Sequence, residues 1–366
     1  MNLKSILSIS AYLKNNNLKR PLLVTTNRSF ELFFKEMLPE DLVYVKYSQY
    51  SVNPKIEDAM RGVEAFRYNK CDSIISLGGG SAIDLSKIIA LFVANDELTI
   101  DNLFDKSLYR AVIPHIAIPT TAGSGSEATQ FAVLYIDGVK HSLDHILLLP
   151  QCSILDPKVL MSLKPLQIAY SGIDAFCQAI ESHWSIKSTE VSKRYSSVAI
   201  KKIWHNFYKA YDKDPHALKE MMLGSNCAGA AINITRTTAP HALSYPFTTL
   251  FGVPHGKAVS LSLLYFMGLA LYSPDEAYLI EKAHVLRSIR SIFELTDCNN
   301  FEEFSASFDS LCKKLGLNLN LSQFKLSDSQ IEQIVDLVNV DRLGNFPVKL
   351  DKKDILSFLK EDRKEV

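Results

Sequence analysis

The sequence has no excess of charge of either sign, because its 40 Lys and Arg residues are balanced by 40 Asp and Glu residues. It therefore lacks the basic character that would draw it to nucleic acids or acidic membranes, and any anionic ligand must be bound by local groups. Long hydrophobic runs are missing as well. The longest, residues 259–272, is interrupted by Ser260, Ser262 and Gly268 and is too short to span a bilayer. We expect a soluble protein with neither a nucleic-acid nor a membrane partner.

Cysteine is sparse. The six cysteines lie far apart without a Cys-x-x-Cys pair, and the N-terminus does not resemble a signal peptide. These absences argue against a disulfide framework and predict a cytoplasmic protein with reduced thiols.

The chain is long enough for two hydrophobic cores, since 366 residues exceed the size at which one core usually keeps growing. Its first part alternates strand and helix patterns. Short apolar runs at residues 21–26, 42–47 and 73–77 predict buried strands, and residues 29–37 and 54–69 predict helices between them. This alternation is typical of a parallel sheet with helical crossovers. We therefore predict an α/β dinucleotide-binding domain over residues 1–160.

Helical periodicity dominates from Pro165 onward. The stretch "GSNCAGAA", residues 224–231, has the small residues that let helices approach closely. The second domain, residues 161–366, is therefore predicted to be all-helical.

Two loops rich in small residues follow predicted strands. "GGGSAIDLSK", residues 78–87, lies between a strand and a helix, where bare backbone N–H groups and the helix N-terminus suit a phosphate. It is not the G-x-G-x-x-G fingerprint, because position 83 is Ile, and a tight turn without a ligand is the alternative. The second loop is "TTAGSGSEAT", residues 120–129. Two such loops beyond the carboxyl ends of one sheet favour a phosphate-bearing cofactor.

A mixed set of oxygen and nitrogen donors occurs in the second domain. Asp174 and Gln178 are four residues apart and share one face of a predicted helix. His241 and His255 lie further along the chain, and together the four side chains suit a divalent metal. The alternatives are that Asp174 caps or solvates its helix and that the histidines are ordinary polar residues.

Five motifs in matching order resemble the iron-containing, group III alcohol dehydrogenases. They are "SLGGGSAIDLSK", "IPTTAGSGSEAT", "LDPKVL", "GIDAFCQAIE" and "FGVPHGKAVSL", within roughly residues 70–262. The resemblance implies the architecture shared by these enzymes and the dehydroquinate synthases: a dinucleotide-binding domain, a helical domain, and a metal with the nicotinamide between them. It also implies a homodimer, a small aldehyde or alcohol as substrate, NAD(P)H, and Fe²⁺ as the metal, with Zn²⁺ as the alternative.

The same resemblance assigns residues to roles. Gly79, Gly80 and Ser81 contact phosphate, Thr120, Thr121 and Ser124 line the pyrophosphate and nicotinamide path, Lys140 binds the cofactor, and Asp174, Gln178, His241 and His255 hold the metal. The first strand ends in "VTTNRS", where Thr26 meets the cofactor and no acid repels a 2′-phosphate. We therefore expect NADPH to be accepted, with Arg28 near its phosphate.

Two positions depart from the family pattern, which usually has histidine where this chain has Gln178 and Tyr245. Together with "INITRTTAPHALSY" they resemble the phosphonoacetaldehyde reductases, which form 2-hydroxyethylphosphonate. On this interpretation Arg236 binds the phosphonate through paired hydrogen bonds, helped by Lys257. The alternative is that Arg236 only pairs with a carboxylate on a helix. Tyr245 and a water molecule are the two candidate proton donors.

Three other functions remain open at this point. They are a general short-chain alcohol dehydrogenase, a lyase related to dehydroquinate synthase, and a nucleotide-binding protein without activity.

Overall fold

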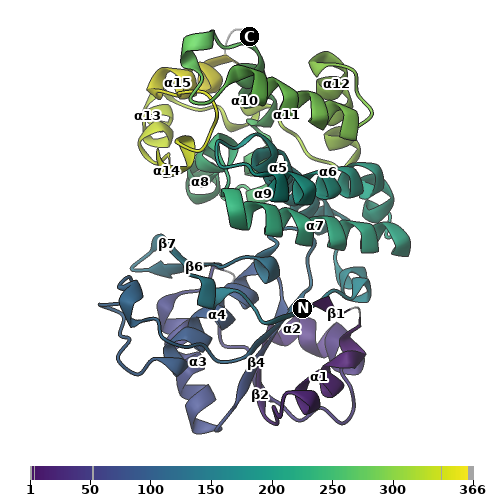
Figure 1. Ribbon diagram of the computed structural model, residues 1–366, viewed down its shortest axis with the longest axis vertical. Helices are drawn as coiled ribbons and strands as arrows, with labels where there is room; N and C mark the ends of the chain where they lie inside the picture. Colours follow the sequence, from purple (N-terminus) through teal and green to yellow (C-terminus); the bar gives the residue numbers. More distant parts are fainter. Residues whose placement is uncertain (1, 4, 52, 339, 362–366) are drawn as a thin grey trace. The chain divides into compact units, whose positions relative to one another are not determined.

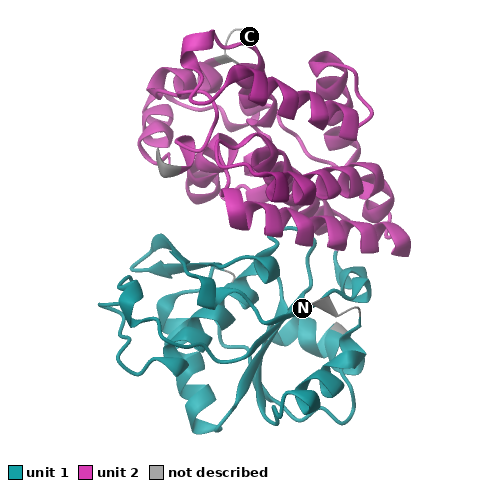
Figure 2. Ribbon diagram, in the orientation of Figure 1, with its two compact units in different colours: residues 1–163 teal, residues 164–366 magenta. Residues whose placement is uncertain are grey.

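The structure, a computed structural model, describes residues 2–3, 5–51, 53–338 and 340–361. The chain forms two compact units, residues 1–163 and 164–366 (Figure 2). Among the described residues, every helix is too short or too polar to cross a membrane.

The first unit is built on a six-stranded parallel sheet with the strand order β1-β8-β5-β4-β2-β3. Figure 1 shows β2 and β4 side by side in this sheet. Its central strands are apolar runs buried on both faces, as parallel sheets require, and Leu22, Leu23 and Val24 are fully inaccessible. The strands are β1 (Asn2–Leu3), β2 (Pro21–Thr25), β3 (Val45–Tyr47), β4 (Ser73–Gly78), β5 (His115–Pro119) and β8 (Cys152–Ile154).

In the described part of this unit, the longer α-helices are α1 (Ile9–Asn15), α3 (Ile56–Tyr68) and α4 (Gly80–Ala94). The α3 and α4 helices pack against each other, and their apolar faces join those of β2 and β4 in one core. The α4 helix starts directly after β4, so the glycine loop lies where a strand turns into a helix, as expected.

The sequence prediction differs from the structure in three places. The expected helix at residues 29–37 consists of α2 (Asn27–Ser29), one π-helical turn (Phe30–Phe34) and one 3₁₀ turn (Lys35–Met37). The expected strand at residues 42–47 pairs only over β3, since Val43 points to solvent. An antiparallel hairpin, β6 (Phe131–Ile136) with β7 (Val139–Asp144), was not foreseen.

The second unit is helical, which confirms the predicted fold class. Its longest helices are packed together, with α5 against both α6 and α7. Gly172 permits this packing, because a Cβ there would lie 2.6 Å from the Phe207 ring and 2.5 Å from the Met221 methyl. The helices are α5 (Pro165–Trp184), α6 (Glu190–Tyr211), α7 (Pro215–Thr235), α8 (Ala239–Phe251), α9 (His255–Ser260), α10 (Leu263–Tyr272), α11 (Lys282–Leu295), α12 (Phe301–Lys314), α13 (Asp328–Asp336), α14 (Val340–Leu343) and α15 (Lys352–Glu361).

A buried histidine makes the stability of the first unit depend on pH. His115, in β5, is 2% exposed, and its Nε2 lies 2.8 Å from the hydroxyl of Ser76. Burial, and then the nearby charge of Lys87, lowers the pKa of His115 to about 3. The ring is therefore neutral in the folded chain and charged in the unfolded chain below pH 6.5, so stability is lost as the pH falls from 6.5 toward 3.

We predict that lowering the pH from 7 to 5 costs about 2 kcal/mol of unfolding free energy through His115. Urea unfolding at both pH values measures this. The variant His115→Gln, which keeps a polar group near Ser76, should lose about 2 kcal/mol less than the wild type over the same interval. His216→Gln, on the exposed first turn of α7, is the control and should behave as the wild type does. An identical pH dependence for wild type and His115→Gln contradicts the prediction.

Candidate functional site

The residues expected to bind the cofactor gather at one edge of the sheet. Strands β5, β4 and β2 are neighbours and run parallel, so their carboxyl ends meet there. Thr26 follows β2, Gly79 to Ser81 follow β4, and Thr120 to Ser124 follow β5. The structure thus brings together every cofactor residue predicted from the sequence, apart from Lys140 on the hairpin.

The two small-residue loops lie directly against each other. Thr120 donates its backbone N–H to the carbonyl of Gly78 over 3.0 Å. A Cβ added at Gly80 would lie 2.9 Å from the hydroxyl of Ser124, and one at Gly79 would lie 3.4 Å from the side chain of Thr121. Since glycine at these positions leaves room and backbone N–H groups at the start of α4, the loops suit a pyrophosphate.

A buried lysine on α4 holds the end of the second loop, a role that the sequence did not reveal. The Nζ of Lys87 donates to Ser126 Oγ over 3.0 Å and to the carbonyls of Thr129 and Phe131 over 2.9 and 2.5 Å. Asp84 accepts from the Ser126 hydroxyl at 2.5 Å. Burial lowers the pKa of Lys87 to about 8 and raises that of Asp84. This network fixes the loop that the cofactor would meet.

Lys140 and Arg28 are both exposed. Lys140 lies on β7 opposite Tyr135, and its charge favours the ionised form of Asp84 against the effect of burial. Arg28 belongs to α2, two residues after Thr26. Both cations are on the same unit as the glycine loop.

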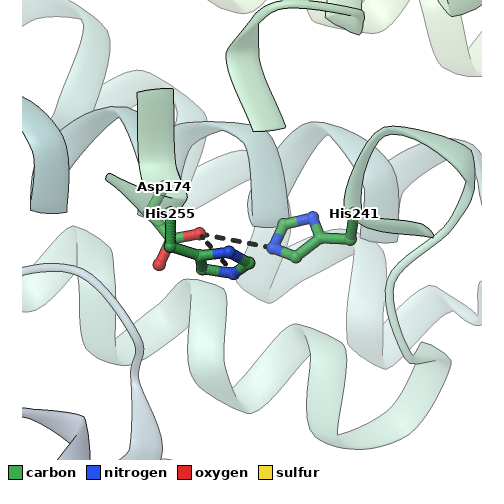
Figure 3. Close-up of side chains that lie close together, drawn as sticks. All are labelled: Asp174, His241 and His255. Atoms are coloured by element: carbon green, nitrogen blue, oxygen red, sulfur yellow. Dashed lines mark ion pairs between the residues drawn. The ribbon is translucent and has the colours of Figure 1, made fainter. Parts of the chain in front are cut away.

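The second unit brings Asp174, His241 and His255 into one cluster (Figure 3). They come from α5, α8 and α9. The Asp174 Oδ1 atom lies 3.3 Å from His241 Nε2 and 3.9 Å from His255 Nε2, and one donor atom from each residue falls within 4.8 Å of the others. Among the described residues, this is the only such group of three or more His, Cys, Asp or Glu side chains.

A glycine explains why His255 reaches Asp174. Gly256, the next residue in α9, packs so closely on α5 that a Cβ there would lie 2.0 Å from the carbonyl oxygen of Tyr170 and 3.0 Å from the Cβ of Asp174. Only a residue without a side chain allows α9 to approach α5 in this way. His255 and Gly256 therefore act together. The glycine makes the contact with α5, and the histidine side chain enters the cluster.

Three buried atoms around the cluster lack a hydrogen-bond partner: Asp174 Oδ1, Gln178 Oε1 and His241 Nε2. Buried polar atoms are almost always hydrogen-bonded, and leaving one unpaired costs about 1–3 kcal/mol. The two oxygens are electron-pair donors, and the His241 nitrogen becomes one when the ring is neutral. A bound cation therefore satisfies all three atoms together. These residues therefore fit a divalent metal, and Gln178, 4% exposed and one helical turn after Asp174, supplies an oxygen.

Glu181 supports the cluster and was missed in the sequence. Its fully buried carboxylate accepts from His241 Nδ1 at 2.5 Å and from the Thr238 backbone N–H at 2.5 Å and hydroxyl at 3.0 Å. Donation from Nδ1 leaves His241 Nε2 as the atom available to a metal. The only sequence signal was its position, seven residues after Asp174 and so on the same face of α5.

The cluster carries an excess of buried negative charge. Burial opposes ionisation of Asp174, but interactions with His255 and His241 outweigh it and lower the pKa of Asp174. Burial likewise opposes a charge on His241, yet Glu181 and Asp174 together raise the pKa of His241 to about 10. Two buried carboxylates therefore stabilise positive charge between them, which is the electrostatic condition for holding a cation.

Three residues were expected to act on the substrate: Tyr245, Arg236 and Lys257. Tyr245, one turn after His241 on α8, has its ring parallel to that of His255, with centroids 6.1 Å apart and an interplanar angle of 7°. Arg236 is the first residue after α7, and only Thr237 and Thr238 separate it from α8. Lys257 instead donates to Gln323 over 3.0 Å.

Comparison with known proteins agrees with this arrangement. The sequence model of the iron-containing alcohol dehydrogenases matches residues 2–157, and that of the C-terminal domain of the same family matches residues 168–362. Long-chain-alcohol dehydrogenase 1 of Geobacillus thermodenitrificans is 30% identical over 84% of this chain and 79% of its own length. The sulfoacetaldehyde reductase of Bilophila wadsworthia is 27% identical over 86% of this chain and 82% of its own.

Solved structures give the same result. The sulfoacetaldehyde reductase of Bifidobacterium kashiwanohense, in complex with NAD⁺, matches 98% of this chain and 95% of its own with a TM-score of 0.86 and 26% identity. An iron-containing alcohol dehydrogenase of Thermotoga maritima matches 99% and 97%, with a TM-score of 0.82 and 27% identity. This chain thus belongs to the iron-containing alcohol dehydrogenase family and is an enzyme of its nicotinamide-dependent, alcohol and aldehyde oxidoreductase class.

Proposed function

We propose that the enzyme reduces a small aldehyde carrying a phosphonate or similar anion to the primary alcohol, with phosphonoacetaldehyde as the substrate and NAD(P)H as the hydride donor. The observation that carries this proposal is the backbone of Arg236. With φ 65° and ψ 176°, this residue adopts a conformation that is essentially restricted to glycine.

Keeping a side chain in that conformation costs about 1–3 kcal/mol, so neighbouring contacts must hold it. The backbone N–H of Arg236 donates to the carbonyl of Ile232 over 2.8 Å, and its own carbonyl accepts from the Thr235 hydroxyl at 2.8 Å. Strain of this kind concentrates at ligand-binding sites. An arginine placed where glycine would be relaxed, three residues before α8, supports a role for its guanidinium in binding the substrate.

Two relatives are consistent with an anionic substrate. The Bilophila and Bifidobacterium proteins are named sulfoacetaldehyde reductases, and sulfoacetaldehyde is a two-carbon aldehyde with a sulfonate. Phosphonoacetaldehyde has the same carbon skeleton with a phosphonate in place of the sulfonate. An arginine offers such groups two parallel charge-assisted hydrogen bonds.

The remaining residues take the following roles. Asp174, His241 and His255 hold a divalent metal with Gln178 as a further oxygen ligand. A metal held by these residues would supply Lewis acidity for the reduction of the aldehyde. Glu181 keeps His241 oriented, the loops after β4 and β5 bind the pyrophosphate, and Tyr245 delivers the proton to the nascent alcohol or orders the water that does.

A general alcohol dehydrogenase is the second candidate. The Geobacillus relative, whose name specifies a long-chain alcohol, favours it. Family membership argues against the lyase and the inactive nucleotide-binding protein.

The first prediction concerns the metal. His255→Ala should lose bound metal and reductase activity while keeping its fold and its affinity for NADPH, because the cofactor loops lie on the other unit. Glu181→Gln should weaken metal binding about 10- to 100-fold, since the orientation of His241 is lost. Elemental analysis, activity and NADPH fluorescence titration measure these effects, with His216→Ala as the control. Stoichiometric metal and undiminished turnover in His255→Ala would refute the assignment.

The second prediction concerns the cofactor. We expect NADPH to be used at least as well as NADH, because Thr26, Asn27 and Arg28 after the first long strand include a cation and no acid. Arg28→Ala should lower kcat/KM for NADPH roughly tenfold and leave that for NADH unchanged, since only NADPH has a 2′-phosphate. Initial rates with both cofactors decide this, and a strong wild-type preference for NADH sinks the idea.

The third prediction concerns Arg236. Arg236→Ala should lower kcat/KM for phosphonoacetaldehyde roughly thirtyfold, equivalent to about 2 kcal/mol, and change that for propionaldehyde little. Arg236→Gly should show the same selective loss and also unfold at a higher temperature than Arg236→Ala, since glycine relieves the backbone strain. Arg290→Ala on α11 is the control. Equal losses for both aldehydes would make Arg236 structural, and wild-type preference for simple alkanals would favour the general alcohol dehydrogenase.

A further inference from the structure

A second arginine lies beside the same segment, although it is distant in sequence. Arg342 belongs to α14, which packs against α8. Its Nη1 donates to the hydroxyl of Thr237, the residue after Arg236, and its Cζ lies 5.8 Å from the centroid of the Tyr245 ring. The guanidinium therefore contacts two residues, Thr237 just before α8 and Tyr245 within it, which are about two helical turns apart.

The same C-terminal segment fixes the backbone around Arg236. Asn345 donates from Nδ2 to the carbonyls of Thr235 and Thr237, over 3.4 and 3.2 Å. Asn345 is itself held, because its own carbonyl accepts from the backbone N–H of Ile186 at 3.1 Å. Residues 342–345 thus hold both neighbours of Arg236, and the Arg342 guanidinium contacts the residue that follows it.

A chain of ring contacts connects Arg342 to the metal cluster. Tyr245 lies near the Arg342 guanidinium and parallel to the ring of His255, which in turn lies 3.9 Å from Asp174. All of these residues belong to the second unit. A four-residue spacing separates Thr237 from His241 and His241 from Tyr245. The three residues therefore lie along one face of α8 and of the segment just before it.

Two cations belong to this segment, because Arg236 lies three residues before α8 and Arg342 donates to the hydroxyl of Thr237. The positive end of the α8 dipole is offset by the buried carboxylate of Glu181, so these two side chains supply the charge that an anion would meet. Glu181, which accepts from Thr238, is already engaged by Thr238 and His241. A guanidinium held by a hydroxyl and a ring loses little further freedom when it binds a ligand.

We propose that Arg342 is a specificity-determining residue that binds the anionic group of the aldehyde together with Arg236. The inference rests on the proposed function and deepens it. A phosphonate or sulfonate presents three oxygens, so it can engage two guanidinium groups at once, whereas a neutral aldehyde gains nothing from either.

The test compares the wild-type holoenzyme with Arg342→Ala, Arg342→Gln and Arg342→Lys, using phosphonoacetaldehyde, sulfoacetaldehyde and propionaldehyde. Arg342→Ala should lower kcat/KM for both anionic aldehydes about tenfold or more, mainly through KM, and leave propionaldehyde within about twofold. Arg342→Lys keeps the charge and loses the paired hydrogen bonds, so it should fall between the wild type and Arg342→Ala. Arg287→Ala, on the exposed face of α11, is the matched control and should match the wild type.

A binding measurement gives a second readout. Methylphosphonate, titrated calorimetrically into the holoenzyme with NADP⁺ bound, should bind the wild type and bind Arg342→Ala at least about tenfold more weakly. Arg342→Gln can still donate to Thr237, so if Arg342→Ala fails to fold, Arg342→Gln must show the selective loss.

The outcomes separate the two proposals. A wild type that prefers propionaldehyde refutes the proposed function and this inference with it. A wild type that prefers phosphonoacetaldehyde, combined with equal losses for all three aldehydes in every folded Arg342 variant, refutes only the role of Arg342. Unchanged methylphosphonate affinity in Arg342→Ala does the same.

Discussion

The contact between Gly256 and α5 is the constraint on which the candidate metal centre depends. It is a contact of backbone with backbone, since a Cβ on Gly256 would lie 2.0 Å from the Tyr170 carbonyl oxygen. No rotamer change relieves such an overlap, so α9 can lie here only with glycine at this position. Because His255 precedes Gly256 and Asp174 lies one turn after Tyr170, the same contact sets the separation of the two side chains. The geometry of the cluster thus comes from helix packing and not from the side chains that form it.

This packing concentrates negative charge at the cluster, and the two buried acids of α5, Asp174 and Glu181, have different roles. Asp174 faces the cluster with a buried oxygen that lacks a hydrogen bond, whereas Glu181 is fully engaged by His241 and Thr238. Glu181 therefore connects the cluster to the first residues of α8. Through it, the orientation of His241 is coupled to Thr238, two residues after Arg236, so the candidate metal cluster and this segment share one buried carboxylate.

The sequence predicted the elements and side chains that repeat a local pattern, and missed those defined by distant contacts. The parallel sheet follows from short apolar runs, and both loops follow from their small residues. The common face of Asp174 and Gln178 follows from their spacing along a helix. Glu181 resembles any acid on a helix until its partners, His241 and Thr238, are known to lie 60 and 57 residues away. Arg342 is 105 residues from Thr237 and lies in no recognisable motif. The hairpin β6–β7 was missed because neither of its strands alternates cleanly between apolar and polar residues.

The ends of α7 and α8 show why a strained arginine persists. Only Arg236, Thr237 and Thr238 separate the two helices, so the backbone must end one helix and begin the next within three residues. A positive φ at the first of them achieves this, and glycine would adopt it without cost. The chain instead has Arg236, whose carbonyl accepts from the Thr235 hydroxyl. Its two neighbours are held as well, since Asn345 donates to the carbonyls of Thr235 and Thr237, and Arg342 donates to the hydroxyl of Thr237. Those polar contacts hold a conformation that the arginine alone would not favour. A glycine at position 236 would not need such contacts, so their presence supports the proposed role of the Arg236 side chain in binding an anion.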